Sequence, residues 1–180
     1  ETEIPTDCAL EGKGFFAVRG VDGQTYYTRN GNFSWSQDSN GNTILATSEG
    51  LPVLDSRGNT IRVPRGVSSE SMVFSSNGTI GYKDATGNVV SLTQSFGIYQ
   101  FNNPAGLEKM SGSKLAATAA SGNPMLEGQN AGLTKTGVYQ GYIEASNVQV
   151  ADEMVNMIIA QRAYELNSKA ITTSDSMLET

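Results

Sequence analysis

Glycine-containing turn dipeptides recur along most of the chain and constrain its fold more than any other sequence feature. Asn-Gly and Asp-Gly favour two-residue type I′ turns, because both central residues of such a turn adopt positive φ. With apolar or alternating runs between them, these dipeptides predict β-hairpins rather than alternating strands and helices. The turn candidates are Asp22-Gly23, Asn30-Gly31, Asn40-Gly41, Arg57-Gly58-Asn59, Asn77-Gly78 and Gly87-Asn88.

Short strand candidates lie between these turns, at a spacing of roughly ten residues that favours a meander or a distorted sandwich. They cover residues 14–19, 25–28, 43–46, 60–63, 72–74, 79–83, 89–92 and 96–101. Residues 103–132 are rich in Ala, Ser, Gly and Asn and include Pro104 and Pro124, which predicts extended coil with turns. We therefore expect an irregular, antiparallel, hairpin-rich β domain.

The sequence changes character after Gly141, because no Gly or Pro occurs from Tyr142 to Thr180. Ser146 with Gln149 three residues later matches a helix capping box. Apolar residues then recur every seven residues, as in a coiled coil. These patterns predict a long α-helix of coiled-coil type over residues 147–180. At 1.5 Å per residue, about 30 residues of such a helix would reach roughly 45 Å, longer than a small core covers, so we expect it to need a partner.

The expected fold class is thus mainly β with α. Its parts are an N-terminal extension (1–8), a β domain (9–133) that includes the extended segment, a connector (134–146) and an assembly helix (147–180). We expect the helix to form an interface with other subunits, and the candidate interface residues are Val150, Met154, Val155, Met157, Ile158, Gln161, Arg162, Tyr164, Ile171 and Leu178.

Charge and composition exclude several classes of function. The formal net charge of −6, with Lys and Arg dispersed, argues against nucleic acid binding. No apolar run is long enough to span a membrane, and the first thirty residues lack a signal-peptide pattern. The chain has no histidine, which removes the usual general base and His-liganded zinc, so we expect no enzyme activity, cofactor or metal. The single cysteine, Cys8, is expected to be a small buried side chain.

Two other classes of function remain open at this point. Tyr26, Tyr27, Phe33 and Trp35 could stack on a carbohydrate, although cross-strand core packing is the commoner role of such a cluster. A glycosidase would need two facing carboxyl groups. The candidates are Asp7, Glu11, Asp22, Asp38, Asp55 and Asp84, several of which sit in turns where acidic residues are usually solvated.

Several motifs follow one another in an order that identifies a family. They are Leu10-Glu11-Gly12-Lys13-Gly14-Phe15-Phe16-Ala17-Val18, Tyr27-Thr28-Arg29-Asn30-Gly31-Asn32-Phe33, residues 47–54, residues 103–107, Gln140-Gly141-Tyr142-Ile143-Glu144-Ala145-Ser146-Asn147-Val148 and residues 153–165. Together they resemble the bacterial flagellar rod and hook proteins across nearly the whole chain. The continuation over residues 164–170 and 175–178 is most similar to the distal rod members of that family.

The resemblance implies a structural subunit that polymerises into a hollow helical tube passing motor torque to the hook. It implies as partners other copies of the chain, proximal rod and hook subunits, and the surrounding periplasmic and outer-membrane rings. It also implies a place in the flagellar basal body, reached through the flagellar type III export apparatus. Family members begin with a further helical segment that nothing before Thr6 matches, so we expect this chain to be the core of a longer subunit.

Overall fold

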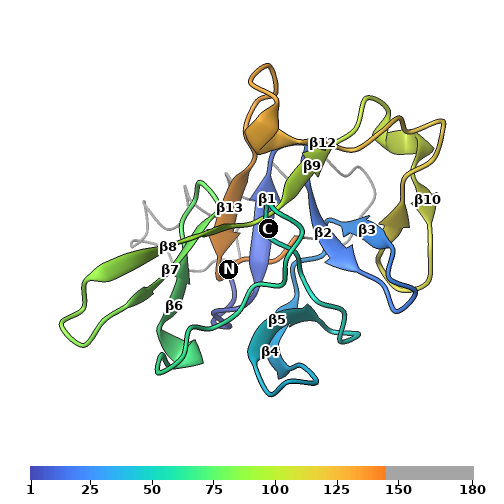
Figure 1. Ribbon diagram of the computed structural model, residues 1–180. Coiled ribbons are helices and arrows are strands. Elements are labelled where there is room, and N and C mark those ends of the chain that lie inside the picture. Colours follow the sequence, from blue (N-terminus) through green and yellow to red (C-terminus); the bar gives the residue numbers. More distant parts are fainter. Residues whose placement is uncertain (145–180) are drawn as a thin grey trace.

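The computed structural model describes residues 1–144, and this part of the chain is built from short antiparallel strands (Figure 1). Three 3-10 turns accompany them: η1 (Ser69–Ser71), η2 (Pro104–Gly106) and η3 (Glu127–Gln129). The strands are β1 (Cys8–Glu11), β2 (Phe15–Arg19), β3 (Thr25–Thr28), β4 (Phe33–Gln37), β5 (Thr43–Thr47), β6 (Met72–Phe74), β7 (Thr79–Lys83), β8 (Val89–Ser95), β9 (Ile98–Gln100), β10 (Glu108–Lys109), β11 (Leu115–Ala116), β12 (Met125–Leu126) and β13 (Gly137–Gln140).

The expected fold class, mainly β with α, is wrong for this structure. Residues 1–144 contain strands and 3-10 turns of three residues each, and no α-helix. Frequent glycine and turn residues leave no stretch of this region with an uninterrupted helical pattern. The predicted helix, residues 147–180, lies outside the described residues.

Four small sheets share the described residues. The largest has the strand order β10-β11-β3-β2-β9-β12, and β6-β7-β8 form a three-stranded meander. β4 pairs with β5 as a hairpin, and β1 pairs with β13 although they are more than a hundred residues apart in sequence. Figure 1 shows the β7–β8 hairpin extending away from the rest of the body. The predicted strand over residues 60–63 is absent, since only isolated bridges form at Thr60 and Arg62.

The core lies between these sheets, and β2 contributes to both of its larger clusters. Phe16 and Val18 point into the main cluster, where Phe16 packs edge-on against Phe33 and Phe96 with ring centroids 4.9 and 5.5 Å apart. The alternate residues Phe15 and Ala17 point to the opposite face, into a second cluster. β2 is therefore buried on both faces and forms the centre of the fold.

One type of turn connects or closes the strands at six places. In each, the first residue's backbone N–H donates to the fifth residue's carbonyl, and the fourth residue's N–H donates to the first residue's carbonyl. The fourth residue is always glycine, with φ between 82° and 90°. This is the three-residue hairpin loop, a type I turn followed by a left-handed glycine. The six turns span residues 20–24, 38–42, 47–51, 55–59, 75–79 and 84–88.

The prediction of hairpins is therefore confirmed, but the prediction of two-residue type I′ turns is wrong. Three of the six turns share the sequence Asp-x-x-Gly-Asn, starting at Asp38, Asp55 and Asp84. In each of them one carboxylate oxygen accepts the backbone N–H groups of the third and fifth turn residues. In these three turns the side chain of the first residue thus stabilises the longer loop.

Candidate assembly site

Both ends of the described chain meet at the β1–β13 ribbon. The backbone N–H of Thr2 donates to the carbonyl of Gly141 at 2.6 Å, and the N–H of Gly141 donates to the carbonyl of Asp7 at 2.7 Å. The side-chain amide of Gln140 donates to the carbonyl of Pro5 at 2.8 Å. Figure 1 shows the N-terminus beside the ends of these two strands. The segment before β1 and the residue after β13 therefore lie side by side.

Arg29 holds this junction together from the end of β3. Its guanidinium donates to the carbonyl oxygens of Gly12 at 2.8 Å and Leu10 at 3.2 Å, and also to that of Gly14. Its Nε lies 3.3 Å from the Oε1 atom of Glu144, the last described residue, and only 11% of each side chain is exposed. The planar guanidinium presents five N–H donors in a fixed geometry and here donates to four acceptors, one more than the three donors of a lysine ammonium could satisfy singly.

Burial governs the charges of this ion pair. It raises the pKa of Glu144, an effect that the nearby Arg29 partly offsets. Burial also lowers the pKa of Arg29, against the opposing effect of Glu144. Desolvation therefore outweighs the mutual attraction for both groups, as is common for buried pairs. The value of the pair lies in fixing the path of the chain between Gly12 and Glu144 rather than in net stability.

A second polar network lies next to this junction and surrounds Glu127. The buried Glu127 carboxylate accepts the N–H of Thr136 at 2.8 Å, the hydroxyl of Thr136 at 2.6 Å and the amide of Gln100 at 2.7 Å. The Thr136 hydroxyl in turn accepts the N–H of Gly14 at 3.0 Å. This network fastens η3 and the chain before β13 onto β9 and the residue before β2. Sequence reasoning missed it, because Glu127 sits in a segment interpreted as coil.

Asp7 adds an unsatisfied acceptor to the junction. The residue is 1% exposed, and among the described residues its Oδ1 atom has no hydrogen-bond partner. It lies beside Cys8, whose pKa is raised, first by burial and then by the Asp7 charge. Cys8 itself is fully buried, as the sequence predicted.

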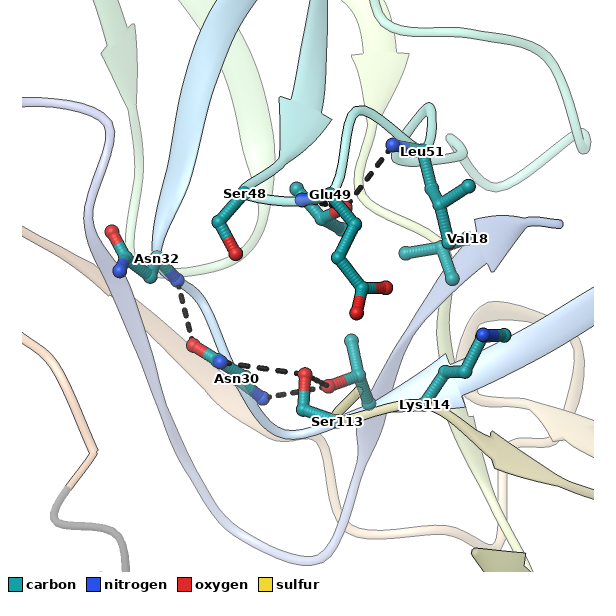
Figure 2. Close-up of a pocket in the computed structure, with 10 residues that line it drawn as sticks. Val18, Asn30, Asn32, Ser48, Glu49, Leu51, Ser113 and Lys114 are labelled. Carbon is teal, nitrogen blue, oxygen red and sulfur yellow. Dashed lines mark hydrogen bonds between the residues drawn. The ribbon is translucent and has the colours of Figure 1, made fainter. Parts of the chain in front are cut away.

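The concave surfaces elsewhere on the described residues are either very small or widely open to solvent. The pocket in Figure 2 has a volume of about 10 Å³, room for about one water. Two of its polar side chains already bind each other, since the Asn30 amide donates to the Ser113 hydroxyl at 3.3 Å. A larger hollow of about 880 Å³ is open to solvent, and its lining includes Leu92 of β8 and the arginines Arg19 and Arg62.

The two other classes of function lose their structural support. Tyr26, Tyr27 and Phe33 are buried, and Trp35 packs against Phe74 with ring centroids 6.3 Å apart, so the aromatic cluster is core packing. Most of the candidate glycosidase acids open or cap turns, as described above for Asp38, Asp55 and Asp84. Asp22 likewise accepts a backbone N–H within its own turn and the hydroxyl of Tyr26.

All ten predicted interface residues, Val150 to Leu178, lie outside the described residues and remain predictions. Within residues 1–144, no group of three or more His, Cys, Asp or Glu side chains could hold a metal ion. No helix in this part of the chain is long and apolar enough to cross a membrane.

Comparison with known proteins gives matches at both ends of the chain. Residues 9–82 match the family described as flagellar hook protein FlgE/F/G D1 domain. Residues 139–180 match the family described as flagellar basal body rod FlgEFG protein C-terminal. The second match begins within β13 and includes Glu144, so the junction held by Arg29 joins the two matched regions.

Individual relatives match over nearly the whole chain. The flagellar basal-body rod protein FlgG of Buchnera aphidicola subsp. Acyrthosiphon pisum is 40% identical over 99% of this chain and 65% of its own length. The protein of the same name from Borreliella burgdorferi is 40% identical over 98% of this chain and 63% of its own. The flagellar hook-basal body complex protein FlhP of Bacillus subtilis is 33% identical over 99% and 64%. The chain thus spans less than two thirds of the length of these relatives.

Proposed function

Because this chain belongs to the flagellar basal-body rod family, we propose that it is a structural subunit of the bacterial flagellar rod, most like the distal rod protein. In this role it polymerises into a hollow helical tube that transmits motor torque to the hook. The observation that carries the proposal is the 40% identity, over 99% of the chain, to a protein named as a flagellar basal-body rod protein.

The junction explains how the β domain would serve such a tube. Arg29 and the Glu127 network fix the chain on either side of Gly14, and the Arg29 guanidinium also holds Glu144. Contacts between copies are assigned to the ten residues from Val150 to Leu178. Heterologous contacts of this kind extend into an open filament when the rotation between copies does not close. The packed β core would keep each subunit rigid under load.

The proposal extends to partners and location. The neighbours are other copies, proximal rod and hook subunits and the surrounding rings, within the flagellar basal body, and the export route is the flagellar type III apparatus. A second candidate is another position along the flagellar axis, such as a proximal rod or hook subunit. The similarity to FlhP, named as a hook-basal body complex protein, favours it.

The test determines where in the flagellar basal body the protein lies. The full-length protein that contains this chain, carrying an epitope tag in an exposed turn, is produced in a bacterium that lacks its distal rod protein. Electron microscopy of purified basal bodies with antibody label should place the tag between the proximal rod and the hook. Label along the hook or proximal rod would favour the second candidate, and basal bodies without label would contradict the proposal.

A further inference from the structure

Three Asn-Gly pairs occur in the sequence, and the structure places them in different surroundings. Glycine has no side chain to obstruct its own nitrogen, so in Asn-Gly this nitrogen can attack the preceding side-chain amide. Asn40-Gly41 and Asn77-Gly78 occupy the same two positions of the same type of turn, and Asn30-Gly31 precedes β4. The pairs therefore form an internal comparison of one reaction in three environments.

Asn30 and Asn77 are both restrained. The Oδ1 atom of Asn30 accepts the N–H of Asn32 at 3.0 Å, and its amide nitrogen donates to Ser113. A methyl group placed on Gly31 would come within 1.8 Å of the Cys8 carbonyl oxygen, so the backbone has no freedom there. The Oδ1 atom of Asn77 accepts the N–H of Thr79 at 3.0 Å. Both following glycines, Gly31 and Gly78, are buried.

Asn40 lacks all of these restraints. Among the described residues its side chain makes no hydrogen bond, because the N–H of Asn42, which its oxygen could have accepted, donates instead to Asp38 at 2.9 Å. Asn40 and Gly41 are both exposed, and nothing lies within 4 Å of the place where a Gly41 side chain would begin. The Gly41 N–H donates to the Asp38 carbonyl at 3.0 Å, and the Gly78 N–H donates to the Ser75 carbonyl at 2.8 Å, so this bond is common to both turns. The turns differ in the exposure of the glycine, and water and hydroxide reach the Gly41 nitrogen when this bond opens.

We infer that Asn40 is a site of spontaneous modification, at which the side-chain amide is converted to a carboxylate without an enzyme. Hydroxide removes the Gly41 N–H proton, the nitrogen attacks Cγ of Asn40, and Nδ2 leaves as ammonia. Water then opens the five-membered imide at one of its two carbonyl carbons and gives aspartate or isoaspartate. The net change is the gain of one water and the loss of one ammonia.

The residue that opens the turn controls this reactivity. Asp38 takes the N–H of the fifth turn residue, whereas Ser75, at the equivalent position, leaves the N–H of Thr79 to Asn77. Asp38 thus frees Asn40, whereas in the turn opened by Ser75 the N–H of Thr79 restrains Asn77. Each product also places a negative charge beside Asp38, and isoaspartate inserts a methylene into the backbone of the β4–β5 turn. The inference is independent of the proposed role in the rod.

The experiment compares the three sites in one sample. The chain is incubated at mildly alkaline pH, and peptide mapping with isoaspartate detection follows each site over time. Modification at Asn40 should be at least about tenfold faster than at Asn30 or Asn77, equivalent to about 1.4 kcal/mol in activation free energy. In urea the three rates should converge, because the local structure is lost. Equal rates in the folded protein, or a faster reaction at Asn77, would overturn the inference.

Two matched variants test the control by the first turn residue. Asp38→Ser should slow the reaction at Asn40, since the N–H of Asn42 becomes available to the asparagine oxygen. Asp84→Ser removes the equivalent aspartate from a remote turn and should leave the rate at Asn40 unchanged. Thermal melting verifies that both variants are folded. An unchanged rate in folded Asp38→Ser protein would contradict the assigned cause.

Discussion

Arg29 is the side chain that connects most parts of the junction, since it reaches three backbone carbonyls and one carboxylate. Its position could not be predicted, because the sequence shows only an arginine before an Asn-Gly turn. The β2–β3 hairpin, which pairs Phe16 with Thr28, brings the carbonyl of Gly14 to Arg29, whereas Glu144 lies 115 residues further along the chain. The resemblance to rod and hook proteins did include Arg29 and Glu144, but in separate motifs and with no sign that they touch.

Replacement of Arg29 by Met should lower the free energy of unfolding by about 3 kcal/mol, the usual cost of removing one partner of a buried pair. The carbonyls and Glu144 lose their donor, while the apolar part of the side chain is kept. Denaturant titration of the variant and of Glu144→Met measures the effect. The double variant should lose less than the sum of the single losses. Additive losses would mean that the two side chains do not interact.

Gly31 tests how closely the backbones of β1 and the turn before β4 approach. The Cβ atom of Gly31→Ala would lie 1.8 Å from the Cys8 carbonyl oxygen, so strands must move apart. We expect a loss of about 2 kcal/mol or more, as in other overpacked sites. Gly132→Ala is the matched control, because nothing lies within 4 Å of its Cβ position. If both variants melted together, the close approach would be refuted.

At the scale of elements, the turns were more predictable than the sheets they connect. The predicted bounds of β3, β6 and β7 are correct, and each of these strands is followed within a few residues by a strong local turn signal. β1 and β13 were not predicted as strands. Each is short, and each pairs with the other across more than a hundred residues of sequence. The two-residue strands β10, β11 and β12 carry almost no periodic signal. Local chemistry determines turns, whereas long-range pairing determines these strands.

The Asp-x-x-Gly-Asn turns predict a specific response to acid. The pKa of Asp38 is lowered, mainly by the hydrogen bond from the backbone N–H of Asn42. The pKa of Asp84 is also lowered, mainly by the hydrogen bond from the Thr86 hydroxyl. A carboxyl group with a lowered pKa stabilises the fold above its ordinary pKa of 3.8, and this contribution is lost as the pH falls through the lower folded value. The stability of the wild-type chain should therefore decline below about pH 4.

The measurement is thermal melting of the wild type and of the Asp38→Asn, Asp84→Asn double variant across the acid range. Asparagine keeps an acceptor oxygen but does not titrate, so the variant should show a flatter decline in melting temperature. Parallel curves for the two proteins would mean that these turns contribute nothing to acid sensitivity.

At the scale of the molecule, the family was recognisable from the sequence, because the motifs that carry it are contiguous. The fold class was not, since the helical pattern that suggested an α component falls beyond residue 144. The junction between the two matched regions could be found only in three dimensions.

Met157 and Tyr164 belong to the predicted interface between copies and lie outside residues 9–133, so replacing both by Lys tests their predicted role in assembly. In the full-length protein, two charges at each repeated contact should abolish incorporation into basal bodies, because an unpaired buried charge costs several kcal/mol. The melting temperature of the chain should change little. A large drop in melting temperature would mean that these residues pack on their own domain, and normal incorporation would mean that they are not part of the interface.

The pairing of β1 with β13 determines how the domain bears force. Cys8 is opposite Gln140, so the start of β1 and the end of β13 lie at the same end of the ribbon. If the two ends are pulled apart, the ribbon opens like a zipper, and its hydrogen bonds break one pair at a time. If both ends are anchored together, each strand carries half the tension and no bond in the ribbon is sheared. The domain should therefore resist little force when its two ends are pulled in opposite directions, and more force when both ends are held at the same point.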